Sequence, residues 1–283
     1  MSIQTETQAI RTAAPSRRGP LWALKWLAMT FGLLVILITL WQVSGTISPS
    51  PEFPPPSQIW DYFVRQFFVG GARFARNPAD AWLGHALPSF LRILGGFILG
   101  CTAGIILGIF TGLSKVFRYS SSWILEFLRA IPTIAVLPLF IVVLAPVGPD
   151  WTRIIFIAYG VSLYVLINTA SGVSSVDPTL IMMGRSFRLS KPAIVWRIVL
   201  PAAQPQIWAG LRIATIGSMI LGIVSEFLIS TNGIGWMIQG YLGPFVLPGM
   251  WAWILLLAIF GLTFNLTIEA IERRVLRWHR NSH

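Results

Sequence analysis

Long apolar runs separated by short polar segments make up most of this 283-residue chain. A helix that crosses a lipid bilayer needs about 20 mostly apolar residues. Six apolar runs approach or reach that length: Trp26–Val43, Ile93–Leu113, Ala130–Val147, Ile154–Val176, Ile213–Ser225 continued past Glu226, and Gly249–Ile268. None of them alternates over about ten residues, as a membrane β-strand does. The pattern therefore predicts an all-α membrane protein with six transmembrane helices.

The composition agrees with this class, and the charges predict how the chain sits in the bilayer. Hydrophobic residues make up 55% of the chain and charged residues 11%, whereas about a quarter of the residues of a soluble domain are charged. A formal net charge of +11 could suggest a nucleic-acid partner. The basic residues, however, lie in four clusters that share one side once six spans are drawn: Arg11, Arg17, Arg18 and Lys25; Lys115 and Arg118; Arg185, Arg188, Lys191 and Arg197; Arg273, Arg274, Arg277 and Arg280. Because basic loops mark the cytoplasmic side, we expect both termini in the cytoplasm and no nucleic-acid partner.

Glycines recur every four residues in the second apolar run: Gly96, Gly100, Gly104, Gly108 and Gly112. Glycine lowers helix propensity, so five in register predict a neighbouring helix whose backbone comes close. Two interpretations are open: the ridge serves tight packing alone, or it is a seam that slides during a conformational cycle. Cys101, the single cysteine, lies in the same run, so no disulfide or thiolate cluster can form within one chain.

The third apolar run differs from the others because it starts with charges and prolines, and we do not expect it to form a simple straight helix. Glu126 and Arg129 are three residues apart and can pair on one helix face. Pro132 and Pro138 predict bends whose freed carbonyls are buried in protein or line a cavity. Further along, glycines and prolines interrupt residues 229–248, which predicts a partly re-entrant outer loop with a short amphipathic turn.

The segment before the second run is rich in proline and then amphipathic. Ser57 can cap a helix to about Phe68 that places Ile59, Trp60, Phe63, Val64 and Phe67 on one face. This helix either lies on the outer membrane interface or packs on the protein's own outer surface. The first apolar run lacks a small-x-small cleavage site, so we interpret it as a retained anchor.

The polar loop between the fourth and fifth runs carries strong helix signals. Asp177 followed by Pro178 predicts a helix start, and the following turns present Met182, Met183 and Phe187. Ser190 can cap a second helix, Ala193–Val199, which we expect to stop at Pro201. Two short helices with protruding apolar side chains form a knob that a soluble partner could grip.

This loop resembles the Glu-Ala-Ala loop of ATP-binding-cassette (ABC) importer permeases, whose pattern is EAA, three residues, G, nine residues, I-x-L-P. Ile198, Leu200 and Pro201 match the end of the pattern. Met182, Met183 and Gly184 occupy the EAA positions, and Arg188 occupies the position of the glycine. Residues 83–100 and 223–238 resemble one subfamily, the nitrate/sulfonate/taurine importer permeases.

The resemblance implies a type I ABC importer permease fold in a bacterial inner membrane. It implies the membrane subunit of an ATP-driven, binding-protein-dependent importer of a nitrate-like oxyanion or an alkanesulfonate such as taurine. The expected partners are cytoplasmic ATPase subunits docked on the loop, an extracytoplasmic solute-binding protein and a second permease copy, forming a homodimer. The chain lacks GxxxxGK[ST], so ATP and Mg²⁺ are expected on the ATPase and no cofactor or metal in this chain. We therefore expect a translocation subunit and not an enzyme.

These expectations divide the chain into five parts. Residues 1–20 form a disordered cytoplasmic N-terminus, residues 21–45 the anchor, and residues 46–84 an extracytoplasmic segment with the interfacial helix. Residues 85–272 form the core permease domain with the cytoplasmic coupling loop 177–201. Residues 273–283 form a basic cytoplasmic tail.

Charged groups within spans are costly and are candidates for function. Glu226, Arg92, Glu126 and Arg129 are the candidates for the translocation pathway. Glu226 has an alternative as a buried pair with an arginine of another span, and Arg92 as a snorkelling arginine at the interface. His85 is expected to make hydrogen bonds and not to bind a metal. The alternative function is a secondary transporter or channel without an ATPase, although no inverted repeats are visible.

Overall fold

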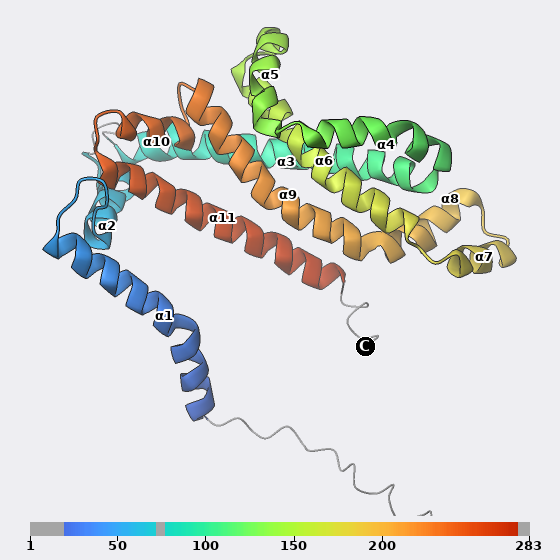
Figure 1. Ribbon diagram of the computed structural model, residues 1–283, viewed down its shortest axis with the longest axis horizontal. Coiled ribbons are helices and arrows are strands. Elements are labelled where there is room, and N and C mark those ends of the chain that lie inside the picture. Colours follow the sequence, from blue (N-terminus) through green and yellow to red (C-terminus); the bar gives the residue numbers. More distant parts are fainter. Residues whose placement is uncertain (1–19, 72–76, 277–283) are drawn as a thin grey trace, which may run out of the picture. The chain divides into compact units, whose positions relative to one another are not determined.

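The computed structural model describes residues 20–71 and 77–276, and within these ranges it contains helices and no strands (Figure 1). Five helices are long and apolar enough to cross a membrane, or six if one bent pair counts as a single span. The predicted all-α membrane fold is therefore confirmed, with six as the upper count of spans. The predictions for residues 1–19 and 277–283 lie outside the described residues.

The chain divides into two compact units at Gln58. The first unit contains α1 (Pro20–Ile47), which covers the anchor predicted over residues 21–45. Apolar side chains from Phe31 onward are largely exposed, as in a span that faces lipid. The proline-rich segment folds back onto the end of α1, where the Ser57 amide donates to the Gln42 side chain at 3.0 Å. The Ser57 hydroxyl accepts from the same Gln42 side chain, so the expected Ser57 cap is wrong, and the helix starts one residue earlier, at Pro56.

The second unit begins in α2 (Pro56–Val64), which continues as a π-helical turn over Arg65–Val69. Phe63 and Phe67 are buried against Trp253, and the buried Gln66 accepts a hydrogen bond from the Tyr241 hydroxyl at 2.6 Å. The interpretation that this helix packs on the protein's own surface is therefore confirmed, although Trp60 stays exposed. Three further elements complete this cluster: a π-helical segment Asp80–Ala86, α10 (Ile234–Leu242) and α11 (Leu247–Val275).

Three long helices form the centre of the second unit: α3 (Leu87–Leu113), α6 (Pro149–Ser174) and α9 (Leu200–Ile229). The predicted glycine ridge faces α6 at all five positions. A methyl carbon on Gly100 would lie 2.6 Å from the Ala158 carbonyl oxygen, and one on Gly108 would lie 2.5 Å from Thr169 Cβ. The close backbone approach is confirmed, and sliding along the seam stays a prediction.

The third span, predicted over residues 130–147 with bends at Pro132 and Pro138, is broken at Pro132. The chain forms α4 (Lys115–Ala130), then a 3₁₀ turn at Thr133–Val136, α5 (Leu137–Val143) and a last 3₁₀ turn at Ala145–Val147. The axes of the two halves are bent by 92° at the break, because Ile131 has extended backbone and Pro132 has no amide to continue the helix. Pro138 begins α5 and does not bend it. No ion pair joins Glu126 and Arg129, both of which lie in the described part of α4.

The polar loop contains α7 (Pro178–Ser186) and α8 (Lys191–Ile194). The expectation that the second helix stops at Pro201 is wrong, because α8 continues through a π-helical turn, Val195–Val199, directly into α9. In that turn the Leu200 amide bonds to the Val195 carbonyl, which places Pro201 in the first turn of α9, where a missing amide is tolerated. Residues 191–229 therefore form one uninterrupted helical segment (Figure 1).

Candidate functional site

The loop before α9 is held in shape by the caps that the sequence predicts. The Asp177 carboxylate accepts from the Thr179 amide at 2.8 Å, and this hydrogen bond holds the pKa of Asp177 below its usual value. The Ser190 hydroxyl accepts from the Ala193 amide at 3.4 Å. Gly184 is buried, and a methyl carbon there would lie 2.6 Å from Ile198 Cδ1. The lack of a side chain at residue 184 thus lets α7 pack closely against the segment that leads into α9.

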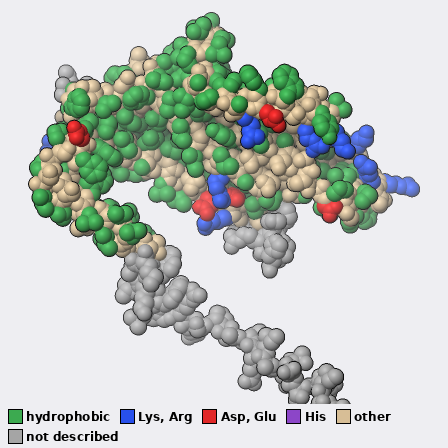
Figure 2. Space-filling model, in the orientation of Figure 1, with side chains coloured by type: hydrophobic (Ala, Val, Ile, Leu, Met, Phe, Trp, Pro, Cys, Tyr) green, Lys and Arg blue, Asp and Glu red, His purple; other side chains and the backbone are tan. Residues whose placement is uncertain are grey.

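The same loop also carries large apolar side chains that are exposed to solvent, and we call this group the loop knob. Its members are Met182 (56% exposed), Met183 (52%), Phe187 (77%) and Trp196 (73%). Figure 2 shows Lys and Arg side chains gathered at the end of the molecule where α7 and α8 lie, and Arg185, Arg188, Lys191 and Arg197 belong to this part of the chain. Apolar side chains exposed on a basic loop are typical of a protein-binding surface.

Arg188 occupies a left-handed backbone conformation, with φ at +56°. This is the position at which the importer pattern has glycine, the residue that adopts positive φ without steric cost. The turn is closed by the Leu189 amide, which donates to the Gly184 carbonyl at 3.1 Å. The backbone geometry at this position is thus the one that glycine favours, although the side chain is arginine.

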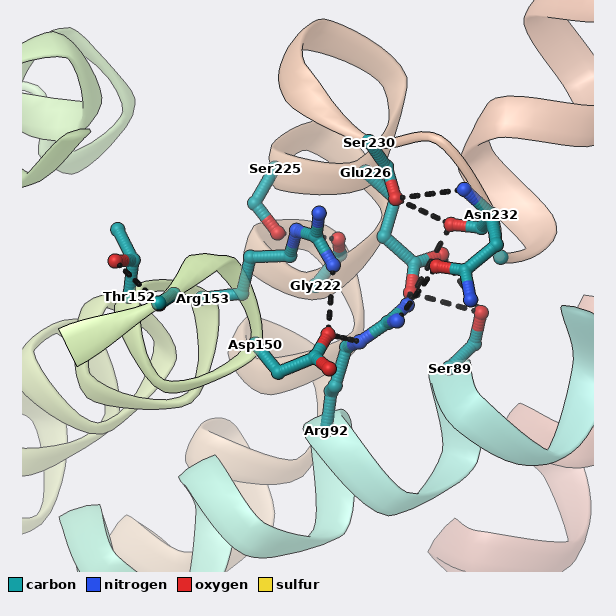
Figure 3. A network of polar contacts seen from close by, with 12 residues as sticks. Ser89, Arg92, Asp150, Thr152, Arg153, Gly222, Ser225, Glu226, Ser230 and Asn232 are labelled. Atoms are coloured by element: carbon teal, nitrogen blue, oxygen red, sulfur yellow. Dashed lines mark hydrogen bonds and ion pairs between the residues drawn. The ribbon is translucent and has the colours of Figure 1, made fainter. Parts of the chain in front are cut away.

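A second polar site joins the ends of α3, α6 and α9 (Figure 3). The Arg92 guanidinium donates to Glu226 at 2.8 Å, to Asp150 at 2.8 Å and to the Asn232 side chain at 2.7 Å. Arg153 donates to the same Asp150 oxygen at 2.9 Å. Arg92 is 5% and Glu226 1% exposed. The alternative of a buried pair is therefore confirmed for Glu226, and the alternative of a snorkelling Arg92 is wrong, because its side chain is buried and its guanidinium bonds to Glu226, Asp150 and Asn232.

The Glu226 carboxylate also holds the start of α10. It accepts from the Ser89 hydroxyl and, at 3.1 Å, from the Gly235 amide, where a helix N-terminus favours negative charge. Gly233 has φ at +115°, and a methyl carbon there would lie 2.5 Å from the carboxylate. The Gly233 amide donates to His85 Nδ1 at 3.2 Å, as expected for a hydrogen-bonded histidine.

The structure therefore brings Arg92 and Glu226 together and places Glu126 and Arg129 elsewhere, on α4. The sequence alone does not identify Ser89, Asp150, Arg153 and Asn232 as members of the network around the buried Arg92–Glu226 pair. The one available signal was that Asp150 and Arg153 are charged residues at the start of an apolar run. A role of these candidates in the translocation pathway stays a prediction.

Comparisons with known proteins agree with this architecture. Residues 102–277 match the family described as binding-protein-dependent transport system inner membrane component. The taurine transport system permease protein of Escherichia coli (strain K12) is 30% identical over 266 residues, which cover 90% of this chain and 94% of that protein. The nitrate import permease protein of a Synechocystis species (strain ATCC 27184) is 29% identical, with 86% of this chain and 87% of that protein covered.

Among solved structures, a chain of the MetNI methionine ABC transporter in an inward-facing conformation has a similar fold. The two chains superpose with a TM-score of 0.57 at 20% sequence identity, covering 70% of this chain and 99% of the other. At this identity the match shows the fold alone, and it is the type I ABC importer permease fold.

Proposed function

Because the chain belongs to the family of binding-protein-dependent transport system inner membrane components, we propose that it imports a small oxyanion with energy from ATP hydrolysed on a separate chain. The chain is a multi-pass inner-membrane ABC permease, and its relatives are permease subunits and not enzymes. The finer proposal concerns its substrate and the way in which ATP hydrolysis drives it.

The loop knob carries the proposal of ATPase coupling. Apolar side chains that are half to three-quarters exposed lie on a loop that the distribution of charge predicts to be cytoplasmic. Met182 and Met183 stand where the family pattern has Glu and Ala, and methionine adapts its shape to an irregular apolar groove. In our proposal the knob docks into a groove on the ATPase, with the ring of Phe187 as its largest anchor.

The continuous segment 191–229 gives a route for movement. Its first turns belong to the docking loop, and its last turn carries Glu226, which is fixed to α3 through Arg92. When two ATPase subunits close on ATP, two docked loops move together, and the long helices of two permease copies rock between inward-facing and outward-facing arrangements. A solute-binding protein on the other side of the membrane delivers the anion, and ATP and Mg²⁺ stay on the ATPase.

The names of the relatives support the substrate class. One relative is named for taurine, which carries a sulfonate group, and another for nitrate. Both groups present several negatively charged oxygens on one small centre. We therefore propose a small solute with a sulfonate or nitrate-like group as the cargo of this chain.

The test replaces knob residues with aspartate in the full importer. Met183→Asp and Phe187→Asp put a charge where the docking needs apolar contact, so we expect ATP-driven uptake and co-purification with the ATPase to be lost. Val116→Asp is the matched control, because Val116 is 77% exposed, like Phe187, and lies at the start of α4 beside Lys115, a basic residue predicted to be cytoplasmic. Unchanged uptake in the knob variants would contradict the proposal, and uptake without any ATPase would favour a secondary transporter or channel.

A further inference from the structure

A polar pocket of about 210 Å³ lies beside the break that follows α4, against α6. Its polar lining consists of Arg129 from the last turn of α4, Thr133 just after the break, and Tyr164 and Asn168 from α6; apolar side chains complete it. The pocket is smaller than the sites of about 300–1,000 Å³ that hold drug-sized ligands. Its size therefore fits a solute of only a few heavy atoms.

The lining has the chemistry of an anion site. It contains one cation, two hydroxyl groups and one amide, and no carboxylate. Within the described residues Arg129 makes no ion pair, unlike Arg92, Arg153, Arg212 and Arg273. A guanidinium presents its N–H groups in a planar fork that matches two oxygens of an oxyanion. An arginine without an ion pair, among neutral polar side chains, is thus available to a ligand, while the Asn168 amide nitrogen also donates to the Tyr164 carbonyl at 2.8 Å.

Two glycines of α9 let that helix pack closely against the α6 residues that line this pocket. A methyl carbon on Gly210 would lie 2.7 Å from Asn168 Cβ, and one on Gly217 would lie 2.9 Å from the Tyr164 ring. Both glycines belong to the same uninterrupted helical segment as α8. A shift of that segment would therefore act directly on Tyr164 and Asn168.

We propose that this pocket is the membrane site of the translocated anion, with Arg129 paired to the sulfonate or nitrate oxygens and Thr133, Tyr164 and Asn168 as neutral hydrogen-bonding groups. This proposal rests on the proposed function, because it names the place where the imported oxyanion binds. It also connects the docking loop to the anion, because movement of α9 widens or narrows the pocket between α6 and Arg129.

The binding test uses the assembled importer in lipid nanodiscs. A Thr133→Cys variant in a Cys101→Ser background reacts with N-ethylmaleimide, a neutral thiol reagent. Saturating nitrate or taurine is expected to slow this labelling, and choline, a cation of similar size, is expected to leave it unchanged. Adding Arg129→Gln to this variant should weaken the protection by about 10- to 100-fold in anion concentration, the loss expected for a hydrogen bond to a charged group.

The transport test measures uptake by Arg129→Gln, with Arg118→Gln on the same helix as the control. We expect uptake to fall at least about tenfold in Arg129→Gln, to recover in part in Arg129→Lys, and to stay unchanged in Arg118→Gln. Co-purification of each variant with the ATPase shows that it folds and assembles.

The outcomes separate this inference from the proposed function. If the wild type imports nitrate or taurine but neither solute slows labelling of the Thr133→Cys variant, or if Arg129→Gln imports at the full rate, the pocket assignment is overturned and the proposed function stands. If the anions slow this labelling through Arg129 but the importer moves neither of them, the site stands and the proposed function is wrong. Equal protection by choline overturns the site as an anion site.

Discussion

The guanidinium of Arg92 lies 2.8 Å from the carboxylate of Glu226, although 134 residues separate them in sequence. The pair joins the start of α3 to the end of α9 inside the protein. We expect Glu226→Ala to lower the free energy of unfolding by about 3 kcal/mol. This is the low end of the range for a broken buried pair, because Arg92 keeps Asp150 as a partner.

This prediction is checked by unfolding the purified permease in mixed detergent micelles. Arg273→Gln is the control, since its pair with Glu269 is exposed on α11 and pairs of this kind contribute about 0–1 kcal/mol. Equal losses in the two variants would contradict a structural role for the Arg92–Glu226 pair.

The glycine ridge allows a comparison between two neighbouring turns of one helix. Gly100→Ala would place a methyl group 2.6 Å from a backbone oxygen of α6, whereas Gly95→Ala would meet Ile154 at an ordinary 3.8 Å. We expect Gly100→Ala to destabilise the protein by about 1–3 kcal/mol through overpacking. Gly95→Ala should be neutral or stabilising by up to about 1 kcal/mol, because alanine favours the helix. Thermal unfolding of both variants in the same detergent measures the two changes in stability. A loss of stability in Gly95→Ala as large as in Gly100→Ala would contradict the close packing of Gly100 against α6.

The positive φ of Arg188 predicts opposite effects of two substitutions. Arg188→Gly removes the steric cost of positive φ, about 1–2 kcal/mol. Glycine also loses more backbone entropy on folding, which costs about 0.5–1 kcal/mol. The loop should therefore be as stable as before or slightly more stable. Arg188→Val should be clearly worse, because a β-branched residue tolerates this conformation poorly. Hydrogen exchange at the Leu189 amide, which closes this turn, measures the effect. Faster exchange in Arg188→Gly than in Arg188→Val would show that the turn has a different backbone.

The Asp177 cap predicts a pH dependence of the loop. Its pKa is below the usual value of 3.8 because the carboxylate accepts the Thr179 amide. The lower value in the folded state means that the cap contributes its stabilisation above the unfolded pKa and loses it as the pH falls through the folded pKa. Protection from hydrogen exchange at the start of α7, measured relative to the intrinsic exchange rate at each pH, should therefore fall only below about pH 4. Asp177→Asn keeps an acceptor without a charge, so it should remove this dependence; persistence of the effect in Asp177→Asn would assign it to another group.

Several features governed by neighbours in the sequence could be predicted from the sequence, although the Ser57 cap could not. The caps at Asp177 and Ser190 and the ridge from Gly96 to Gly112 depend on spacing within one element, and the structure contains all of them. The break at Pro132 was expected as a bend, but its size of 92° depends on how two short helices pack. The continuation of the helix past Pro201 could not be predicted from the sequence, because the π-helical turn before it is defined by backbone hydrogen bonds and not by residue type.

The buried network shows why candidate sites are harder to predict. Arg92 and Glu226 were both recognised as unusual charges, yet neither residue reveals its partner in sequence. Asp150 and Asn232 come from a third helix and from a loop, and only the packing of α3, α6 and α9 brings their oxygens to one guanidinium. The pocket at Arg129 depends in the same way on Tyr164 and Asn168 of another helix.

The length of the uninterrupted segment 191–229 has a geometric consequence. Its last 30 residues form α9, which is about 45 Å long at 1.5 Å per residue and about 42 Å along the membrane normal at an average tilt of about 20°. A bilayer with its headgroups is only about 40–45 Å thick. The residues of the segment that precede α9, Lys191–Ile194 and Val195–Val199, therefore lie beyond the lipid. A water-soluble domain can therefore bind this end in the aqueous phase and can move it without entering the bilayer.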